Sequence, residues 1–116
     1  MPRFAFQLRV KADKLAEYDD LHRHVWPELI QEMETFGIKD YSIFRRGQDL
    51  FLTLRVDDFD ELIRRLESSE VNRRWQAMML PFWEPVPGKR DDEPFAMMQE
   101  VFYMPGNCEG NNDGLR

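Results

Sequence analysis

One histidine in this sequence lies between two large aromatic residues at helical spacing. Tyr18, His22 and Trp26 recur at every fourth position and therefore share one face of a helix. An imidazole exchanges protons near neutral pH, so His22 in a pocket is a candidate for general acid–base catalysis. A histidine on an apolar helix face is more often a packed, hydrogen-bonded residue, and the spacing alone favours that interpretation. His24 points roughly opposite and is predicted to be a solvated surface residue.

Three other residues could line a pocket with His22. Tyr41, on a predicted strand, carries a phenol that can reach a polar ligand, although a strand tyrosine is more often a packing residue with a solvated hydroxyl. Trp75 belongs to an apolar helical stripe, and in a carbohydrate site a tryptophan face covers the C–H side of a sugar ring. Gln76 and the two arginines before Trp75 could hydrogen-bond sugar hydroxyls, although a solvated helix face explains the arginines more simply.

The remaining polar residues indicate no further site. Asp20 and Asp19 precede Arg23 by three and four residues and are expected to form ordinary helical ion pairs with it. The sequence contains no glycine-rich phosphate loop, no serine or cysteine nucleophile motif and no pair of carboxylates suited to catalysis. One cysteine and two nearby histidines cannot form a closed structural zinc site, and we expect neither a metal nor another cofactor.

Length, composition and charge limit the class of protein. With 116 residues, 42% hydrophobic and 13% aromatic, the chain has material for one core, so we expect one domain over residues 1–106 and a disordered tail over residues 107–116. A formal charge of −6 argues against a nucleic-acid or anionic membrane partner, because both require a basic surface. The single cysteine, Cys108, favours a reducing compartment, and neither a leader-like pattern nor a membrane-spanning apolar run appears. We therefore expect a soluble, cytoplasmic protein.

Hydrophobic periodicity predicts the elements that must position these side chains. Residues 3–10 alternate between apolar and polar types, which indicates a half-buried strand. Asp13 is expected to cap the long helical pattern that carries His22, Pro27 to interrupt it and Gly37 to end it. The later predicted elements are strands at residues 39–46 and 50–56, a helix capped at Asp58, a helix at residues 71–82 and a strand at residues 97–104.

The predicted order is strand–helix–strand–strand–helix–strand. This order is typical of an α+β, ferredoxin-like (split βαβ) fold, in which the helices cover one face of an antiparallel sheet. The other face then lacks a cover within the chain. A small sheet with an open face often pairs with a copy of itself, so we expect a symmetric homodimer.

A set of short segments runs in order, at near-constant spacing, to about Pro105. These segments are Glu17-Tyr18, His22, Trp26-Pro27-Glu28-Leu29, Gly37, Asp40-Tyr41-Ser42-Ile43, Arg74-Trp75, Gln99-Glu100-Val101-Phe102-Tyr103 and Met104-Pro105. In this combination the sequence resembles the L-rhamnose mutarotase family. The resemblance implies a dimeric ferredoxin-like α/β barrel that interconverts the α and β anomers of an aldose.

The resemblance also implies roles for individual residues. His22 matches the family's proton donor, and Tyr18, Tyr41 and Trp75 match its sugar-binding residues. Gln76 stands where the family typically has a second tryptophan, and we keep it as a candidate sugar-binding residue. Proline is common in the family at position 24, and the loop at residues 85–95 lacks the family's usual Asn-Pro-Asp-Asn-Ser run. These departures concern the walls of the site and therefore bear on which sugar is bound.

Three hypotheses follow. The leading one is a cofactor-free aldose mutarotase, an isomerase that acts on the monosaccharide L-rhamnose, or on L-fucose or another aldose, by general acid–base ring opening and closure. The second is a cofactor-free monooxygenase, because dimeric ferredoxin-like barrels also support that chemistry. The third is a sugar-binding domain without turnover.

Overall fold

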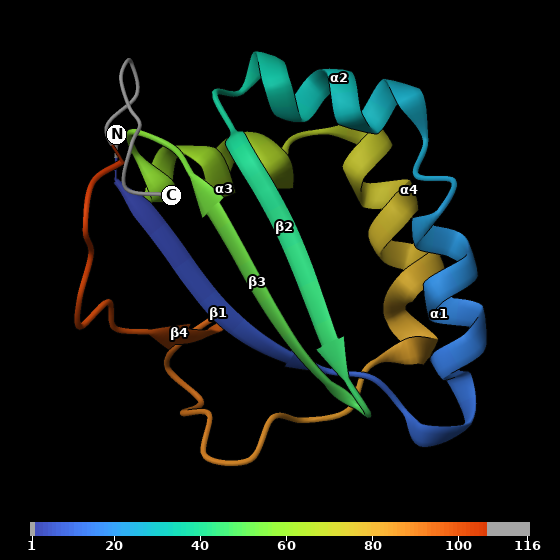
Figure 1. The fold of residues 1–116 in the computed structure, drawn as a ribbon. Coiled ribbons are helices and arrows are strands. Elements are labelled where there is room, and N and C mark those ends of the chain that lie inside the picture. The colour runs from blue at the N-terminus through green and yellow to red at the C-terminus, as the bar shows by residue number, and fades with distance from the viewer. Residues whose placement is uncertain (1, 107–116) are drawn as a thin grey trace.

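The computed structural model describes residues 2–106, which form four strands, four α-helices and two short 3-10 segments (Figure 1). In chain order these elements are β1 (Arg3–Arg9), η1 (Ala12–Lys14), α1 (Leu15–His22), α2 (Pro27–Thr35), β2 (Lys39–Arg46), β3 (Asp49–Arg55), α3 (Phe59–Glu67), α4 (Glu70–Met79), η2 (Leu80–Phe82) and β4 (Ala96–Met98). The predicted tail, with Cys108, lies outside the described residues. Within residues 2–106, every helix is too short or too polar to cross a membrane.

The strands form one antiparallel sheet in the order β2-β3-β1-β4. The central pair, β1 and β3, is in register from Arg3 opposite Arg55 to Arg9 opposite Asp49. The chain enters at β1, crosses through α1 and α2 to the far edge, returns by the β2–β3 hairpin and crosses again through α3 and α4 to β4 (Figure 1). The predicted α+β, ferredoxin-like fold is therefore confirmed.

The core lies between the helices and one face of the sheet. Along β3, Leu50, Leu52 and Leu54 are buried, whereas Phe51 between them is exposed on the opposite face. The buried leucines pack in two hydrophobic clusters with side chains of the helices, including Leu29 of α2. Burying a leucine fully is worth about 1.5–3 kcal/mol, so this alternation fixes which face the helices cover.

Proline and capping residues set most helix boundaries. The α1 helix ends at His22, and α2 begins with Pro27 at its first position, where the missing backbone N–H costs no helical hydrogen bond. This confirms the predicted interruption. The Oδ1 of Asp58 accepts a 3.0 Å hydrogen bond from the backbone N–H of Glu61, which confirms the predicted cap of α3. Ser69 caps α4 in the same way through its Oγ.

The prediction that Asp13 caps the helix carrying His22 is wrong. Asp13 lies inside η1, which is closed by a 3.0 Å hydrogen bond from the backbone N–H of Lys14 to the carbonyl oxygen of Lys11. Lys14 precedes α1 and makes no side-chain cap. The extra 3-10 turn moves the start of the α-helix past the aspartate.

The last strand is shorter than predicted, ending at Met98 instead of residue 104. In the observed register Ala5 lies opposite Met98, so Glu100 falls opposite Arg3, the first residue of β1. Their side chains form an ion pair at 2.9 Å. β4 ends two residues before this point, and the contact between Glu100 and Arg3 is made by side chains.

Candidate functional site

A cavity of about 670 Å³ lies between the helices and the helix-covered face of the sheet. We refer to it as the histidine cavity. Its volume falls within the range of small-molecule sites, about 300–1,000 Å³. Apolar residues from β1, β2 and β3 and from α2, α3 and α4 form much of its wall. The polar and aromatic part of the lining includes Tyr18, Asp19, His22, Tyr41, Arg45 and Trp75.

His22, the last residue of α1, is oriented by its own helix. Its Nδ1 lies 3.0 Å from the carbonyl oxygen of Tyr18. A carbonyl oxygen can only accept, so Nδ1 carries a proton and the neutral ring has its lone pair on Nε2. Nε2 can therefore take up a proton, and it can release that proton from the charged form. Both properties are required of a general acid–base group.

Aromatic rings hold the imidazole on two sides. The His22 ring stacks on Tyr18, with ring centroids 4.1 Å apart and an angle of 26° between planes. It meets Trp75 of α4 edge to face at 5.5 Å and 85°. Trp26, in the connection that Pro27 creates, packs on Trp75 at 5.1 Å and 87°. These contacts leave the ring little freedom to turn, because buried side chains pack closely.

Both tyrosines of the cavity are held in the neutral form. Tyr18 is 3% exposed, and burial is the main cause that raises its pKa; the charges of Tyr41 and Asp19 add to this rise, and Arg45 opposes it. Burial raises the pKa of Tyr41 to about 12. Tyr41 nevertheless keeps 40% of its surface accessible. It forms part of the wall of the open cavity.

An irregularity in β2 directs Tyr41 towards the cavity. Lys39 pairs with Arg55 and Ser42 pairs with Thr53, so β2 contains one more residue than β3 between these pairs. Asp40 occupies the bulge with a φ of 53°, in the left-handed region that aspartate tolerates better than most residues. Tyr41 and Ile43, two residues apart, share one face of β2 as predicted, and both line the cavity.

Asp19 pairs with a strand instead of its own helix, which corrects the prediction that it pairs with Arg23. Arg45 of β2 donates from Nε to Oδ1 of Asp19 at 2.7 Å and from Nη2 to Oδ2 at 2.5 Å. These hydrogen bonds are the main cause that lowers the pKa of Asp19 and raises that of Arg45. Only Asp20 pairs with Arg23, at 3.6 Å. Helical spacing could not reveal the approach of β2.

Gln76 also lines the cavity, although its side chain is exposed. Its Nε2 lies 3.5 Å from Oδ1 of Asn72, which fixes it only weakly. Trp75 beside it is 6% exposed. The two arginines before Trp75 are exposed, and so is His24, as predicted. The cavity thus brings together His22, Tyr18, Tyr41, Trp75 and Gln76.

Sequence reasoning missed two residues of the cavity wall. Arg45 looked like an ordinary strand arginine. Trp83 follows η2, where the helical pattern has already ended, and its ring lies 5.9 Å from that of Tyr18. Its backbone bridges to Val10 at the end of the first strand. Spacing alone gave no signal for either residue.

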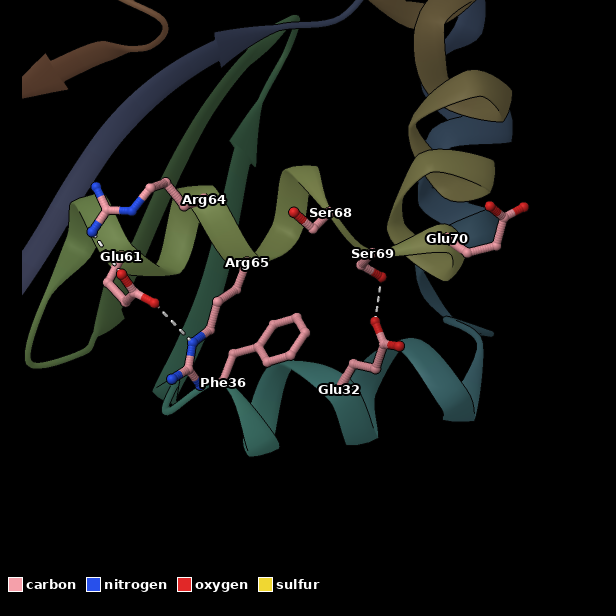
Figure 2. Close-up of a pocket in the computed structure, with 8 residues that line it drawn as sticks. All are labelled: Glu32, Phe36, Glu61, Arg64, Arg65, Ser68, Ser69 and Glu70. Carbon is pink, nitrogen blue, oxygen red and sulfur yellow. Dashed lines mark hydrogen bonds and ion pairs between the residues drawn. The ribbon is translucent and has the colours of Figure 1, made fainter.

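A second hollow, of about 620 Å³, opens between α2 and α3 (Figure 2). We refer to it as the α2–α3 groove. Glu61 pairs there with Arg64 at 2.6 Å and with Arg65 at 3.2 Å. The Oγ of Ser69 donates to Glu32 (Figure 2). Within residues 2–106, no group of three or more His, Cys, Asp or Glu side chains is arranged to hold a metal ion, in the groove or elsewhere.

Comparison with known proteins relates this architecture to one family. A sequence profile of the family described as L-rhamnose mutarotase matches residues 3–104. The chain is 32% identical over 107 residues to the L-rhamnose mutarotase of Oceanobacillus iheyensis, which covers 90% of this chain and 99% of the relative. It is 35% identical over 107 residues to that of Rhizobium meliloti, with the same coverage.

Two solved structures share the fold. A crystal structure of an L-rhamnose mutarotase from Formosa agariphila superposes with a TM-score of 0.73 at 28% identity, covering 90% of this chain and all of the other. The tetracenomycin F2 cyclase of Streptomyces glaucescens, a type-II polyketide cyclase, matches at a TM-score of 0.58 and 20% identity over 90% of this chain and 96% of the cyclase, which supports the fold alone. With its sequence matched almost from end to end, the chain belongs to the L-rhamnose mutarotase family.

Proposed function

We propose that this protein is an aldose mutarotase that interconverts the α and β anomers of L-rhamnose or a related 6-deoxy sugar such as L-fucose. The observation that carries the proposal is His22, an imidazole with Nε2 free, held between Tyr18 and Trp75 in a cavity large enough to admit a monosaccharide. Membership of the L-rhamnose mutarotase family supports the same reaction and the same substrate class.

The reaction requires two proton movements. One proton goes to the ring oxygen while the anomeric hydroxyl loses another. The bond between C1 and the ring oxygen breaks, C1 becomes an aldehyde, and rotation about C1–C2 presents the other carbonyl face for closure. We assign the protonated, charged form of His22 as the group that donates a proton from Nε2 to the ring oxygen and recovers it on closure, while the proton of the anomeric hydroxyl passes to water. A positioned acid–base group of this kind accelerates a reaction by roughly 10²–10⁴-fold.

The other candidate residues bind and orient the sugar in this proposal. Tyr18 and Tyr41 keep their protons at neutral pH, because burial raises both pKa values, so each phenol can donate a hydrogen bond to a sugar oxygen. Trp75 offers an aromatic surface to the C–H side of the ring. Gln76 offers an amide that both donates and accepts.

We further propose that the protein acts as a cytoplasmic homodimer joined through the open face of the sheet. Phe44 and Phe51 lie opposite each other on β2 and β3, and Phe44 is 64% exposed. The segment after β4 adds Val101, which is 89% exposed, and Phe102. An apolar surface of this kind is usually covered by a partner. Light scattering of the purified protein tests the dimer.

Exchange spectroscopy tests the activity. Saturating the NMR signal of one anomer of L-rhamnose should attenuate the signal of the other far more strongly with the enzyme than without it. A panel of L- and D-aldoses then identifies the preferred sugar. A protein that binds the sugar and shifts its melting temperature without accelerating exchange is a binding domain, and one that consumes oxygen is a monooxygenase. Either result contradicts the proposal.

A further inference from the structure

The histidine cavity contains a charged pair that the proposed chemistry leaves unused. Asp19 of α1 and Arg45 of β2 both line the cavity, and their side chains are 34% and 27% exposed. Building on the proposed mutarotase function, we propose that this pair is a specificity-determining element that hydrogen-bonds the C3 and C4 hydroxyls of the bound sugar. Its role is to select sugars by hydroxyl pattern, while His22 performs the proton transfer.

The pair is rigid before any ligand arrives. Three nitrogens of Arg45 are engaged, because Nε and Nη2 bind Asp19 and Nη1 donates to the carbonyl oxygen of Gly47 at 2.8 Å. The carboxylate of Asp19 is fixed by two of these hydrogen bonds. A bidentate arrangement of this kind holds both groups in one plane. A ligand therefore meets the pair without first having to order it.

Both groups keep hydrogen-bonding capacity after they have paired. Each terminal nitrogen of Arg45 retains one unused N–H, and each carboxylate oxygen of Asp19 retains a lone pair. A sugar hydroxyl donates one hydrogen bond and accepts others. Two adjacent hydroxyls thus match a carboxylate beside a guanidinium, which can accept from one and donate to the other.

The position of the Asp19–Arg45 pair relative to His22 determines which sugar hydroxyls the pair can contact. Asp19 precedes His22 by three residues, so the two are neighbours on the helix surface, roughly 4.5 Å apart along the helix axis. This separation is comparable to the width of a pyranose ring. Asp19 and Arg45 both lie close enough to the Tyr18 phenol to affect its pKa, because the charge of Asp19 raises that pKa and the charge of Arg45 lowers it. With His22 at the ring oxygen, the pair lies beside the carbons remote from C1, which are C3 and C4.

A second explanation is that the pair only ties α1 to β2. The two explanations differ in what they predict for altered sugars. A structural tie affects every substrate equally, because it acts through the position of α1. A hydroxyl contact affects only those sugars that carry the hydroxyl.

The experiment measures kcat/KM for anomer exchange in the wild type, Asp19→Asn and Arg45→Leu. The substrates are L-rhamnose and its analogues that lack the hydroxyl at C2, C3 or C4. We expect Asp19→Asn to lower kcat/KM for L-rhamnose by about ten- to a hundredfold, mainly through KM, as for loss of a hydrogen bond to a charged group. The decrease in kcat/KM caused by Asp19→Asn should shrink to a few-fold with the analogue that lacks the C3 or C4 hydroxyl. It should keep its full size with the analogue that lacks the C2 hydroxyl.

Asp20→Asn is the matched control. Asp20 is the next residue of the same helix, pairs with Arg23 and does not line the cavity. It should behave as wild type on all four sugars. An equal loss on every analogue, or no loss with Asp19→Asn on L-rhamnose, would overturn the proposal.

Two further measurements keep the result decisive. Asp19→Asn preserves the shape of the side chain, so it carries the test if Arg45→Leu fails to fold, as judged by circular dichroism. If the wild type accelerates no aldose, the mutarotase function fails separately. Calorimetric titration with the same four sugars then tests the pair. The proposal is supported if the wild type binds the C3 and C4 analogues more weakly than L-rhamnose and Asp19→Asn shows no such difference. Equal affinity for all four would refute it.

Discussion

The histidine cavity and the α2–α3 groove have similar volumes, about 670 and 620 Å³, but different chemistry. In the cavity, the rings of Tyr18 and Trp75 contact one imidazole whose Nε2 is free. In the groove, each arginine faces a carboxylate on its own helix, with Arg64 and Arg65 both paired to Glu61 (Figure 2). The difference shows that the size of a hollow does not define a site. A site requires buried groups that converge and keep unused hydrogen-bonding capacity.

Burial explains why the two regions differ. The side chains of Arg64 and Arg65 are 65% and 50% exposed, so water screens their ion pairs and these contribute little. Tyr18 and Trp75 are almost completely buried. Electrostatic and hydrogen-bonding interactions are stronger where water is excluded. Substitutions in the cavity should therefore change catalysis, whereas substitutions in the groove should change stability at most.

The largest effect is expected from removing the imidazole. His22→Ala should lower the anomer exchange rate by roughly 10²–10⁴-fold, as for loss of a positioned acid–base group, while the fold is retained. Exchange NMR on L-rhamnose measures the rate, and circular dichroism measures the fold. His24→Ala is the control, since His24 is exposed and should leave the rate near that of the wild type. Near-complete loss in both variants would contradict the assignment of His22.

The wall of the cavity should matter for stability as well as for activity. Trp75 packs edge to face against both His22 and Trp26 within the core. Trp75→Ala should lower the free energy of unfolding by about 3–5 kcal/mol, the usual cost of truncating a buried tryptophan. Urea unfolding measures this. Arg64→Ala, on the exposed side of the groove, should unfold at the same urea concentration as the wild type. If Trp75→Ala and Arg64→Ala lose equal unfolding free energy, the cavity and the groove do not differ in their contribution to stability.

The groove is expected to have one structural role, at Ser69. Its Oγ caps α4 by accepting from the backbone N–H of Asn72 at 3.0 Å and donates to Glu32. Ser69→Ala should therefore cost about 0.5–2 kcal/mol of unfolding free energy. Anomer exchange per folded molecule should stay unchanged. A large loss of exchange with stability intact would show that the groove takes part in function.

Local signals explain what the sequence predicted well. The backbone geometry of proline restricts it to the first turn of a helix, so Pro27 marked the interruption after His22. Alternation along β2 put Tyr41 and Ile43 on one face. These features depend on neighbours in the chain. They were enough to place His22, Tyr41 and the split βαβ order.

Features that depend on distant partners could not be predicted from the sequence. Asp19 was expected to pair with Arg23 on its own helix, but Arg45 approaches it from β2. Trp83 lines the cavity from a segment whose backbone bridges to Val10, the residue after β1. In each case a contact between segments far apart in sequence determined the outcome.

The smallest effect on stability is expected from Tyr41, and it should be absent at neutral pH. Burial raises the pKa of Tyr41 to about 12, from 10.0 in water, whereas neighbouring arginines lower the pKa of Glu61 in the groove. Between pH 10 and about 12 the Tyr41 hydroxyl therefore stays protonated in the folded protein but loses its proton in the unfolded chain. The stability that Tyr41 contributes is complete below about pH 10 and is lost as the pH rises towards about 12.

Tyr41→Phe should therefore reduce the loss of unfolding free energy across this alkaline window. The variant should also remove a step from the tyrosinate absorbance titration near pH 12. Tyr103→Phe is the control, because Tyr103 lies outside the cavity. If the alkaline loss of stability is identical in wild type and Tyr41→Phe, the hydroxyl of Tyr41 is hydrated. The cavity would then differ from the groove in shape but not in its exclusion of water.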